Sequence, residues 1–379
     1  MESHNRKVYE YWLHNLPGIG DRTIEKLLLF FGSAGRIYEA SEKELEQVLR
    51  KKEKAAEVIG FRNSWDLQWE YEKLLKKNIS FYTAEDAEYP GRLKKLVHPP
   101  FGIYCRGQLL PEEKPTVAII GARECSGYGE MMAEAFAERL AGAGVSIVSG
   151  MARGIDGISQ NAAAAAGGST YAVLGCGVDI CYPASNKKLY EKLKESGGII
   201  SPYLPGTMPQ KMLFPYRNQL VAGLSDAVLV IEARQKSGTW ITVDRALEQG
   251  KDIYAVPGRL TDRLSDGCNL LIRQGAGIAL SPDDILAELK MLENRKKKKN
   301  MDCNKGEEQG LLKWLDYYPK PVDEIMEAVK REDGEMTLPR LMLELVQLCM
   351  QGKAEQIGGN YFMKIRSTVS TTIPTVSDG

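Results

Sequence analysis

The sequence predicts an α/β fold, in which a doubly wound, mostly parallel sheet carries helices on both faces. Between residues 80 and 290, apolar runs, glycine-containing turns and amphipathic segments follow one another repeatedly, the pattern of strands that alternate with helices. The clearest unit is V-A-I-I-G-A-R, from Val117 to Arg123, where an apolar run enters a glycine turn. With 379 residues, 43% of them hydrophobic, the chain can bury such a core and is long enough for two or three domains.

The elements of the sheet follow from the apolar runs and the segments between them. Strands are expected at Thr116–Ile120, Val145–Ser149, Thr170–Leu174, Gly198–Ser201, Ala227–Ile231 and Asp252–Val256. Helices are expected near residues 128–142, 155–166, 186–195, 215–223 and 240–249. This alternation indicates an extended Rossmann-like domain over residues 76–292, a fold that binds ligands at the carboxyl ends of its strands. We therefore expect a site in the loops that follow the strands.

The segment before this domain has a helical pattern. Residues 1–75 are expected to form a SAM-like or helix-hairpin-helix-like helical domain, because L-P-G-I-G at Leu16–Gly20 precedes an amphipathic run at Ile24–Phe31. A helix-hairpin-helix can hold a DNA phosphate on its backbone amides, but a plain tight connection between helices is favoured here.

The segments after the domain differ from it in composition. Residues 293–309 are highly charged and are expected to be a flexible linker. Residues 310–367 are expected to form a winged helix, whose third helix offers Arg340 among apolar and acidic residues and does not favour sequence-specific reading of duplex DNA. Its helices are expected at Leu311–Tyr317, Val322–Val329 and Leu338–Met350, and its hairpin strands at Ala354–Ile357 and Tyr361–Ile365. Residues 368–379 are rich in Ser and Thr and are expected to be disordered.

Composition limits the class of protein. Lys plus Arg and Asp plus Glu both number 50, so any binding of nucleic acid must come from local clustering of charge. The seven cysteines form no C-x-x-C pair and no secretory segment precedes them, which predicts free thiols in a reducing cytoplasm and no metal site. No run of 18 apolar residues occurs, so no contact with a membrane is expected.

The turn after the first strand differs from a dinucleotide-binding turn. Such a turn needs G-x-G-x-x-G, in which the second glycine lets the backbone approach the pyrophosphate. Here the three positions are Gly121, Arg123 and Ser126. A guanidinium argues against NAD, but the glycine turn, the helix N-terminus and the positive charge all suit a phosphate. We expect no cofactor and a phosphate-bearing ligand from outside.

The other loops at the same sheet edge combine glycines, hydroxyls and basic side chains. The further candidate nucleic-acid contacts in them are Gly150, Arg153, Asn186, Lys187, Lys211, Phe214, Arg217, Asn218, Lys236, Ser237 and Gly238. Backbone amides beside glycines can meet phosphate oxygens, while the cations spread charge along a groove that suits a nucleic-acid strand. Arg153 and Arg217 have an open alternative, internal pairing with a carboxylate such as Asp156. Phe214 is the best candidate for base stacking.

Catalytic groups are scarce in these loops. The histidines are His4, His14 and His98, all outside the sheet loops. The chain has no G-x-x-x-x-G-K-[ST], no G-x-S-x-G and no H-E-x-x-H. We therefore expect a binding protein without catalytic residues.

The loop motifs together resemble the DNA-processing protein A (DprA/Smf) family. The resemblance rests on V-A-I-I-G-A-R, S-G-M-A-R-G-I-D, G-V-D-I-C-Y-P-A-S-N, F-P-Y-R-N-Q-L-V-A-G-L-S-D, V-I-E-A-R-Q-K-S-G-T-W-I-T and Y-A-V-P-G, in the family's order and spacing. It implies a cytoplasmic homodimer that binds and protects single-stranded DNA and loads the RecA recombinase during natural transformation. The DNA contacts that it implies are Arg123, Lys187, Lys211 and Lys236, and the implied dimer interface is at Gly267–Leu280, with Leu270, Leu271 and Ile278.

Two alternatives to this function remain open. One is a Rossmann-type nucleotide phosphoribohydrolase, whose P-G-G-x-G-T-x-x-E motif is faintly similar to Lys236–Asp244; Thr242 stands where that motif needs its glutamate. The other is a winged-helix transcription regulator, which would prefer a particular duplex sequence.

Overall fold

The computed structural model describes residues 2–289, 311–315, 319–331, 334, 336–357 and 359–364. The chain divides into two compact units, Met1–Leu292 and Glu293–Gly379. The expected linker at 293–309 and the expected disordered tail at 368–379 lie outside the described residues.

In the part of the first unit that the structure describes, the centre is a nine-stranded sheet with the order β1-β2-β6-β5-β4-β3-β7-β8-β9. The strands are β1 (Ser80–Thr83), β2 (Gly102–Gly107), β3 (Thr116–Ile120), β4 (Ser146–Ser149), β5 (Thr170–Val173), β6 (Gly198–Ser201), β7 (Ala227–Val230), β8 (Asp252–Ala255) and β9 (Gly277–Ile278). Neighbours from β6 to β9 in this order are parallel, and β1 and β2 add an antiparallel edge. The expected mixed α/β architecture with a large, mostly parallel sheet is confirmed.

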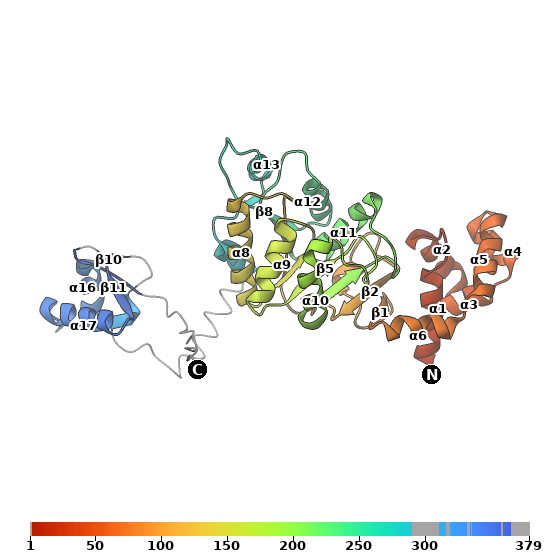
Figure 1. Cartoon of the computed structure of the whole chain (residues 1–379), viewed down its shortest axis with the longest axis horizontal. Helices are drawn as coiled ribbons and strands as arrows, with labels where there is room; N and C mark the ends of the chain where they lie inside the picture. The colour runs from red at the N-terminus through yellow and green to blue at the C-terminus, as the bar shows by residue number, and fades with distance from the viewer. Residues whose placement is uncertain are drawn as a thin grey trace, which may run out of the picture. The chain divides into compact units, whose positions relative to one another are not determined.

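Helices cover both faces of the sheet (Figure 1). On one face lie α7 (Gly91–Lys94), α11 (Phe214–Leu224), α12 (Thr239–Glu248) and α13 (Asp266–Arg273). On the other lie α8 (Gly127–Gly142), α9 (Ile155–Ala165), α10 (Lys187–Ser196) and α14 (Pro282–Glu288). In β3, Ala118 and Ile120 pack on the first side, whereas Val117 and Ile119 pack on the second. Burial of both faces explains why the strand is an unbroken apolar run.

The residues before the sheet form short helices. They are α1 (Glu2–His14), α2 (Asp21–Phe31), α3 (Ala34–Glu39), α4 (Glu42–Leu49), α5 (Lys52–Ser64) and α6 (Leu67–Lys76). Their core surrounds Trp12, which is fully buried. The Leu16–Gly20 turn connects α1 to α2, and Gly18 adopts a positive φ of 65° there, which glycine tolerates without strain.

The second unit contains helices and a small sheet with the strand order β10-β12-β11. Its elements are η3 (Leu311–Trp314), β10 (Lys320–Pro321), α16 (Val322–Lys330), α17 (Leu338–Met350), β11 (Ala354–Gln356) and β12 (Tyr361–Lys364). The helix expected at Leu311–Tyr317 is, in its described part, a single 3-10 turn over Leu311–Trp314.

Candidate nucleic-acid interface

A pocket lies at the carboxyl ends of the parallel strands, where β3 and β7 are neighbours in the sheet. The chain moves outward from β3 in one direction through β4, β5 and β6, and in the other through β7, β8 and β9. Such a reversal opens a crevice between the loops that leave the two central strands. The pocket has a volume of about 560 Å³ and is lined by the loop after β3, the loop before α12 and the start of α11.

The pocket wall contains an aromatic ring with two guanidinium groups close to it. The guanidinium carbon of Arg123 lies 5.7 Å from the centre of the Phe214 ring, and that of Arg217 lies 5.5 Å from it. The Tyr182 ring is 6.0 Å from the Phe214 ring. Arg123 is exposed, Phe214 is half-buried and Arg217 is only 4% exposed. One cation is therefore free to meet a ligand, and the other supports the ring from within.

Arg217 forms part of the pocket floor. It donates hydrogen bonds to the carbonyl oxygens of Gly150 and Val173, the latter at 2.9 Å. Its charge opposes the effect of burial on Asp156, whose pKa is nevertheless raised. Asp156 also accepts a hydrogen bond from the Gly150 amide at 3.2 Å. The Arg217 guanidinium is therefore held inside the chain by backbone carbonyl oxygens, and among the described residues it forms no ion pair with Asp156.

The N-terminus of α8 is already occupied by a carboxylate of the same chain. Glu232, at the end of β7, is fully buried and accepts hydrogen bonds from the Ser126 amide, at 2.9 Å, and from the Ser126 hydroxyl. The Ser126 oxygen in turn accepts from the Gly129 amide at 3.1 Å. A side chain at Gly129 would collide with the Glu232 carboxyl group. Glu232 thus takes the place that a dinucleotide pyrophosphate occupies in other Rossmann-like turns.

This arrangement gives Ser126 a structural role beside the expected contact with DNA, which stays a prediction. Its hydroxyl donates to Glu232 and accepts from Gly129, and Ser126 lines a different pocket, of about 660 Å³, together with Tyr128 and Pro257. It is the N-cap of α8, and its hydroxyl already has two partners in the chain.

The N-terminus of α12 is open, in contrast. Ser237, Gly238 and Thr239 line the pocket, and no side-chain hydrogen bond caps this helix. The Ser237 oxygen is buried and has no hydrogen-bond partner among the described residues. A helix N-terminus with an unpartnered hydroxyl beside it is suited to receive an anion.

The structure brings most of the expected contacts together. Those that line the large pocket are Gly121, Arg123, Gly150, Lys211, Phe214, Arg217, Asn218, Ser237 and Gly238. Arg153 lines an adjoining cavity of about 50 Å³. Arg234, which the sequence also places among the basic residues at this edge of the sheet, is exposed and lines the large pocket.

Besides Ser126, three expected contacts lie outside both linings. Asn186 donates to the carbonyl oxygens of Met151, at 3.0 Å, and Ala152, at 3.1 Å, so its amide shapes the loop after β4. Lys187 and Lys236 are exposed and belong to neither lining. Sequence reasoning missed the role of Glu232; its one signal was an acidic residue directly after a buried strand.

Only part of the segment expected to form a dimer interface is exposed at the surface of the chain. Leu271 is 4% exposed and packs in the core beneath the sheet, so it cannot belong to a surface contact. Leu270 is half-buried, whereas Ile278 is 50% exposed. The expectation therefore holds no longer for Leu271 and stays a prediction for the other two.

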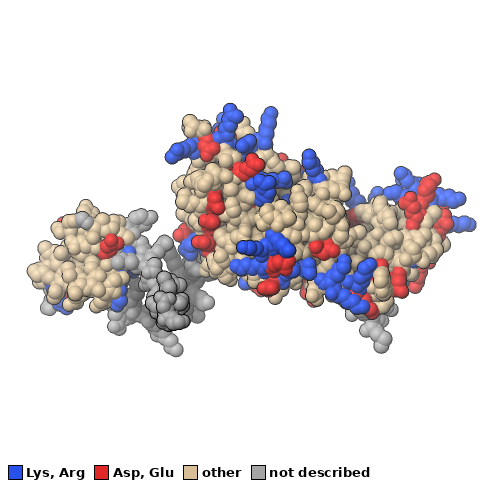
Figure 2. Space-filling view, in the orientation of Figure 1, with Lys and Arg blue, Asp and Glu red and all other residues tan. Residues whose placement is uncertain are grey.

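Other features of the described residues bear on the class of protein. The cysteines among them are free thiols. The described part of the chain contains no group of three or more His, Cys, Asp or Glu side chains placed to hold a metal ion. No helix in the described ranges is both long and apolar enough to cross a membrane. Lys and Arg are interspersed with Asp and Glu over the visible face of the first unit. Several of the basic side chains project from the edge near α12 and α13 (Figure 2).

Comparison with known proteins agrees with the geometry. Residues 80–290 match the family model described as DNA recombination-mediator protein A. The chain is 41% identical to DNA processing protein DprA of Streptococcus pneumoniae over 216 residues, 57% of this chain and 76% of that protein. It is 35% identical to Protein Smf of Synechocystis over 286 residues, 74% of this chain and 72% of that protein.

Two solved structures are similar as well. An X-ray structure of DprA from S. pneumoniae matches with a TM-score of 0.65 at 33% identity, covering 74% of this chain and 97% of that one. A structure of DNA processing protein A from Helicobacter pylori, described for its single-stranded DNA binding mode, matches with a TM-score of 0.51 at 33% identity, covering 55% and 95%. The family model that matches residues 80–290 and the similarity to these relatives show that the chain belongs to the DNA recombination-mediator protein A family.

Proposed function

We propose that this chain binds single-stranded DNA, without sequence preference, in the pocket between β3 and β7. The observation that carries the proposal is the combination of exposed cations, an open helix N-terminus and a half-buried aromatic ring in one crevice. Arg123, Lys211 and Arg234 supply the charge, and Phe214 supplies the ring. This combination suits a strand whose phosphates and bases are both accessible.

The parts of the pocket have different roles in this binding. A phosphate is held by the start of α12 and by the Arg123 guanidinium, because both present hydrogen-bond donors to the same crevice. A base lies against Phe214, which Arg217 supports from the buried side. None of these contacts reads a base edge, so the binding is independent of sequence. The DNA-binding mode described for the H. pylori relative supports the proposal.

Fluorescence anisotropy tests the proposal directly. The full chain is titrated into labelled oligo-dT and into the matching duplex, each at two salt concentrations, together with Arg123→Ala. We expect preference for the single strand, and a loss of about 0.7 from the log–log salt slope in the variant, the effect of one lost phosphate contact. Preference for duplex, or an unchanged slope in Arg123→Ala, would contradict it.

We also propose finer roles that the family resemblance implies. The chain forms a homodimer through the exposed part of the segment at Leu270 and Ile278, and it delivers bound strands to RecA. Residues 1–75 form a helical domain of the SAM or helix-hairpin-helix kind, and residues 310–367 form a winged helix. Light scattering tests the dimer, and the rate of RecA assembly on oligo-dT with and without the chain tests the delivery.

The proposal is one of binding without turnover. On α12, buried Thr242 stands where a phosphoribohydrolase needs a carboxylate. Release of free base from a nucleoside monophosphate by the purified chain would contradict this part of the proposal.

A further inference from the structure

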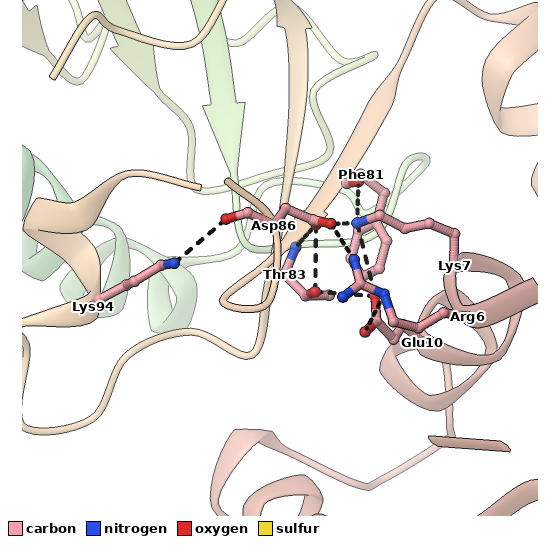
Figure 3. Close-up of polar contacts among 7 residues, drawn as sticks. All are labelled: Arg6, Lys7, Glu10, Phe81, Thr83, Asp86 and Lys94. Atoms are coloured by element: carbon pink, nitrogen blue, oxygen red, sulfur yellow. Dashed lines mark hydrogen bonds and ion pairs between the residues drawn. The ribbon is translucent and has the colours of Figure 1, made fainter. Parts of the chain in front are cut away.

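The N-terminal helices contact the rest of the first unit through hydrogen bonds at several places. At the start of α1, Asp86 accepts hydrogen bonds from Arg6, at 2.7 Å, and from Lys7, and Glu10 accepts one from the Thr83 hydroxyl at 3.0 Å (Figure 3). These residues join α1 to β1 and the turn that follows it. Neither β1 nor this turn contributes a residue to the pocket lining.

A second contact lies at the end of α1. The Tyr104 hydroxyl is 2.9 Å from the His14 ring nitrogen Nδ1 and accepts a hydrogen bond from Asn15 at 3.4 Å. Tyr104 is fully buried on β2. This strand, too, contributes no residue to the pocket lining.

A third contact, at the start of α2, reaches the pocket helix itself. Asp21, the first residue of α2, accepts a hydrogen bond from the Phe101 amide at 3.2 Å and one from the Tyr216 hydroxyl at 2.7 Å. Tyr216 lies in α11 between Phe214 and Arg217, both of which line the pocket. One carboxylate therefore connects the N-terminal helices to the first turn of the helix that carries the aromatic ring.

The surroundings of Tyr216 extend this connection to the loop before α11. The Tyr203 ring is 6.3 Å from the Tyr216 ring, in an edge-on arrangement. The Tyr203 hydroxyl donates to the carbonyl oxygen of Leu213 at 2.8 Å, just before α11 begins. Burial, with the nearby Asp21 carboxylate, raises the pKa of Tyr203 to about 12 and raises that of Tyr216. Both hydroxyls therefore keep their protons, and remain donors, at neutral pH.

We propose that Asp21 is a positioning residue for the DNA pocket, acting through the Tyr216 hydroxyl. It fixes the start of α11, and with it the Phe214 ring and the Lys211 loop, in the orientation that binds a strand. The proposal rests on the function proposed above, because its main readout is affinity for single-stranded DNA. It makes the N-terminal helices part of the binding apparatus without requiring them to touch DNA.

The test compares two substitutions of the same kind. Tyr216→Phe and Tyr104→Phe each remove one hydroxyl that bridges the N-terminal helices to the sheet. We expect Tyr216→Phe to raise the Kd for oligo-dT about three- to tenfold, the size of one ordinary hydrogen bond. Tyr104→Phe should leave this Kd unchanged, whatever its effect on Tm. Asp21→Ala in the Tyr216→Phe background should weaken binding little further, because the two groups act as one unit.

A second readout does not depend on DNA. Hydrogen–deuterium exchange of the free chain should be faster at residues 213–218 in Tyr216→Phe and in Asp21→Ala, but not in Tyr104→Phe. Unchanged Kd and unchanged exchange in Tyr216→Phe would overturn the proposal. If Arg123→Ala also fails to weaken binding of oligo-dT, the proposed function has failed, and exchange alone then decides whether Asp21 positions α11.

Discussion

Two helices begin at the same edge of the sheet, but the N-terminus of one is capped by side chains and that of the other is not. At α8, Ser126 caps the helix and the buried Glu232 carboxylate occupies the space beside it. At α12, Ser237 and Gly238 face the pocket and no side chain caps the helix. Both termini present backbone donors to an anion, but only one of them is available to an anion from outside.

The difference distinguishes the place of a dinucleotide pyrophosphate from the phosphate site that we propose. The position after β3 is closed by an internal carboxylate and by the arginine in the turn, whereas the position after β7 stays open. In the proposed binding mode, the open start of α12 and the exposed cations beside it hold a phosphate of the strand. A bound dinucleotide would instead need the α8 start, which is filled.

The largest effect is expected at Arg217, which lines the same pocket as the open start of α12. Arg217→Met keeps the volume but leaves the Gly150 and Val173 carbonyl oxygens without their donor and removes the positive charge that offsets the buried Asp156 carboxyl group, at a cost of about 3–5 kcal/mol in the free energy of unfolding. Urea unfolding measures it. The matched control is Arg139→Met, which removes an exposed ion pair with Asp283 and should cost less than about 1 kcal/mol. An equal loss of unfolding free energy in the two variants would show that Arg217 does not stabilise the pocket floor.

The next largest effect is expected from removing the Glu232 carboxylate from the N-terminus of α8. Glu232→Ala removes the partner of Ser126 and should lower the free energy of unfolding by about 1–3 kcal/mol. It also frees the α8 N-terminus, so inorganic phosphate should raise the Tm of the variant more than that of the wild type.

Thermal unfolding with phosphate or chloride at matched ionic strength measures this gain. Glu124→Ala is the control, because Glu124 is an exposed carboxylate in the pocket lining. It removes the same charge nearby without opening α8. If phosphate stabilises all three proteins equally, Glu232 does not exclude anions from this helix.

The smallest effects are expected from a pair of serines. Ser237→Ala removes a buried hydroxyl that has no partner among the described residues, so it should leave stability unchanged or slightly higher while weakening oligo-dT binding about threefold. Ser126→Ala should do the reverse, with about 1 kcal/mol of stability lost and no change in Kd. Paired measurements of Tm and Kd on both variants decide this, and a loss of affinity in Ser126→Ala would refute the assignment of roles.

The sequence predicted the central strands closely because their signal is local. Each strand from β3 to β8 is an apolar run that ends near a glycine or a polar turn, and its observed bounds differ from the expected ones by at most a residue or so. The strands β1 and β2 were missed because they precede the repeating pattern and pair antiparallel at the edge. The two-residue strand β9 is too short to leave a pattern.

The candidate site was predictable in its composition but not in its contacts. Glycines, hydroxyls and cations after the strands indicated where a phosphate would bind, because parallel strands end at one edge. The partner of Ser126 is 106 residues away in the chain, and the partner of Asp21 is 195 residues away. Such pairings depend on how the layers pack, and no local sequence pattern predicts them.

A crystal structure of the chain with a short oligo-dT tests the central claim most directly. We expect a phosphate within hydrogen-bonding distance of the Ser237–Thr239 amides and of the Arg123 guanidinium, with a base against Phe214 and Glu232 still bound to Ser126. A phosphate at the α8 N-terminus with Glu232 displaced, or a strand that lies outside the pocket, would contradict the account.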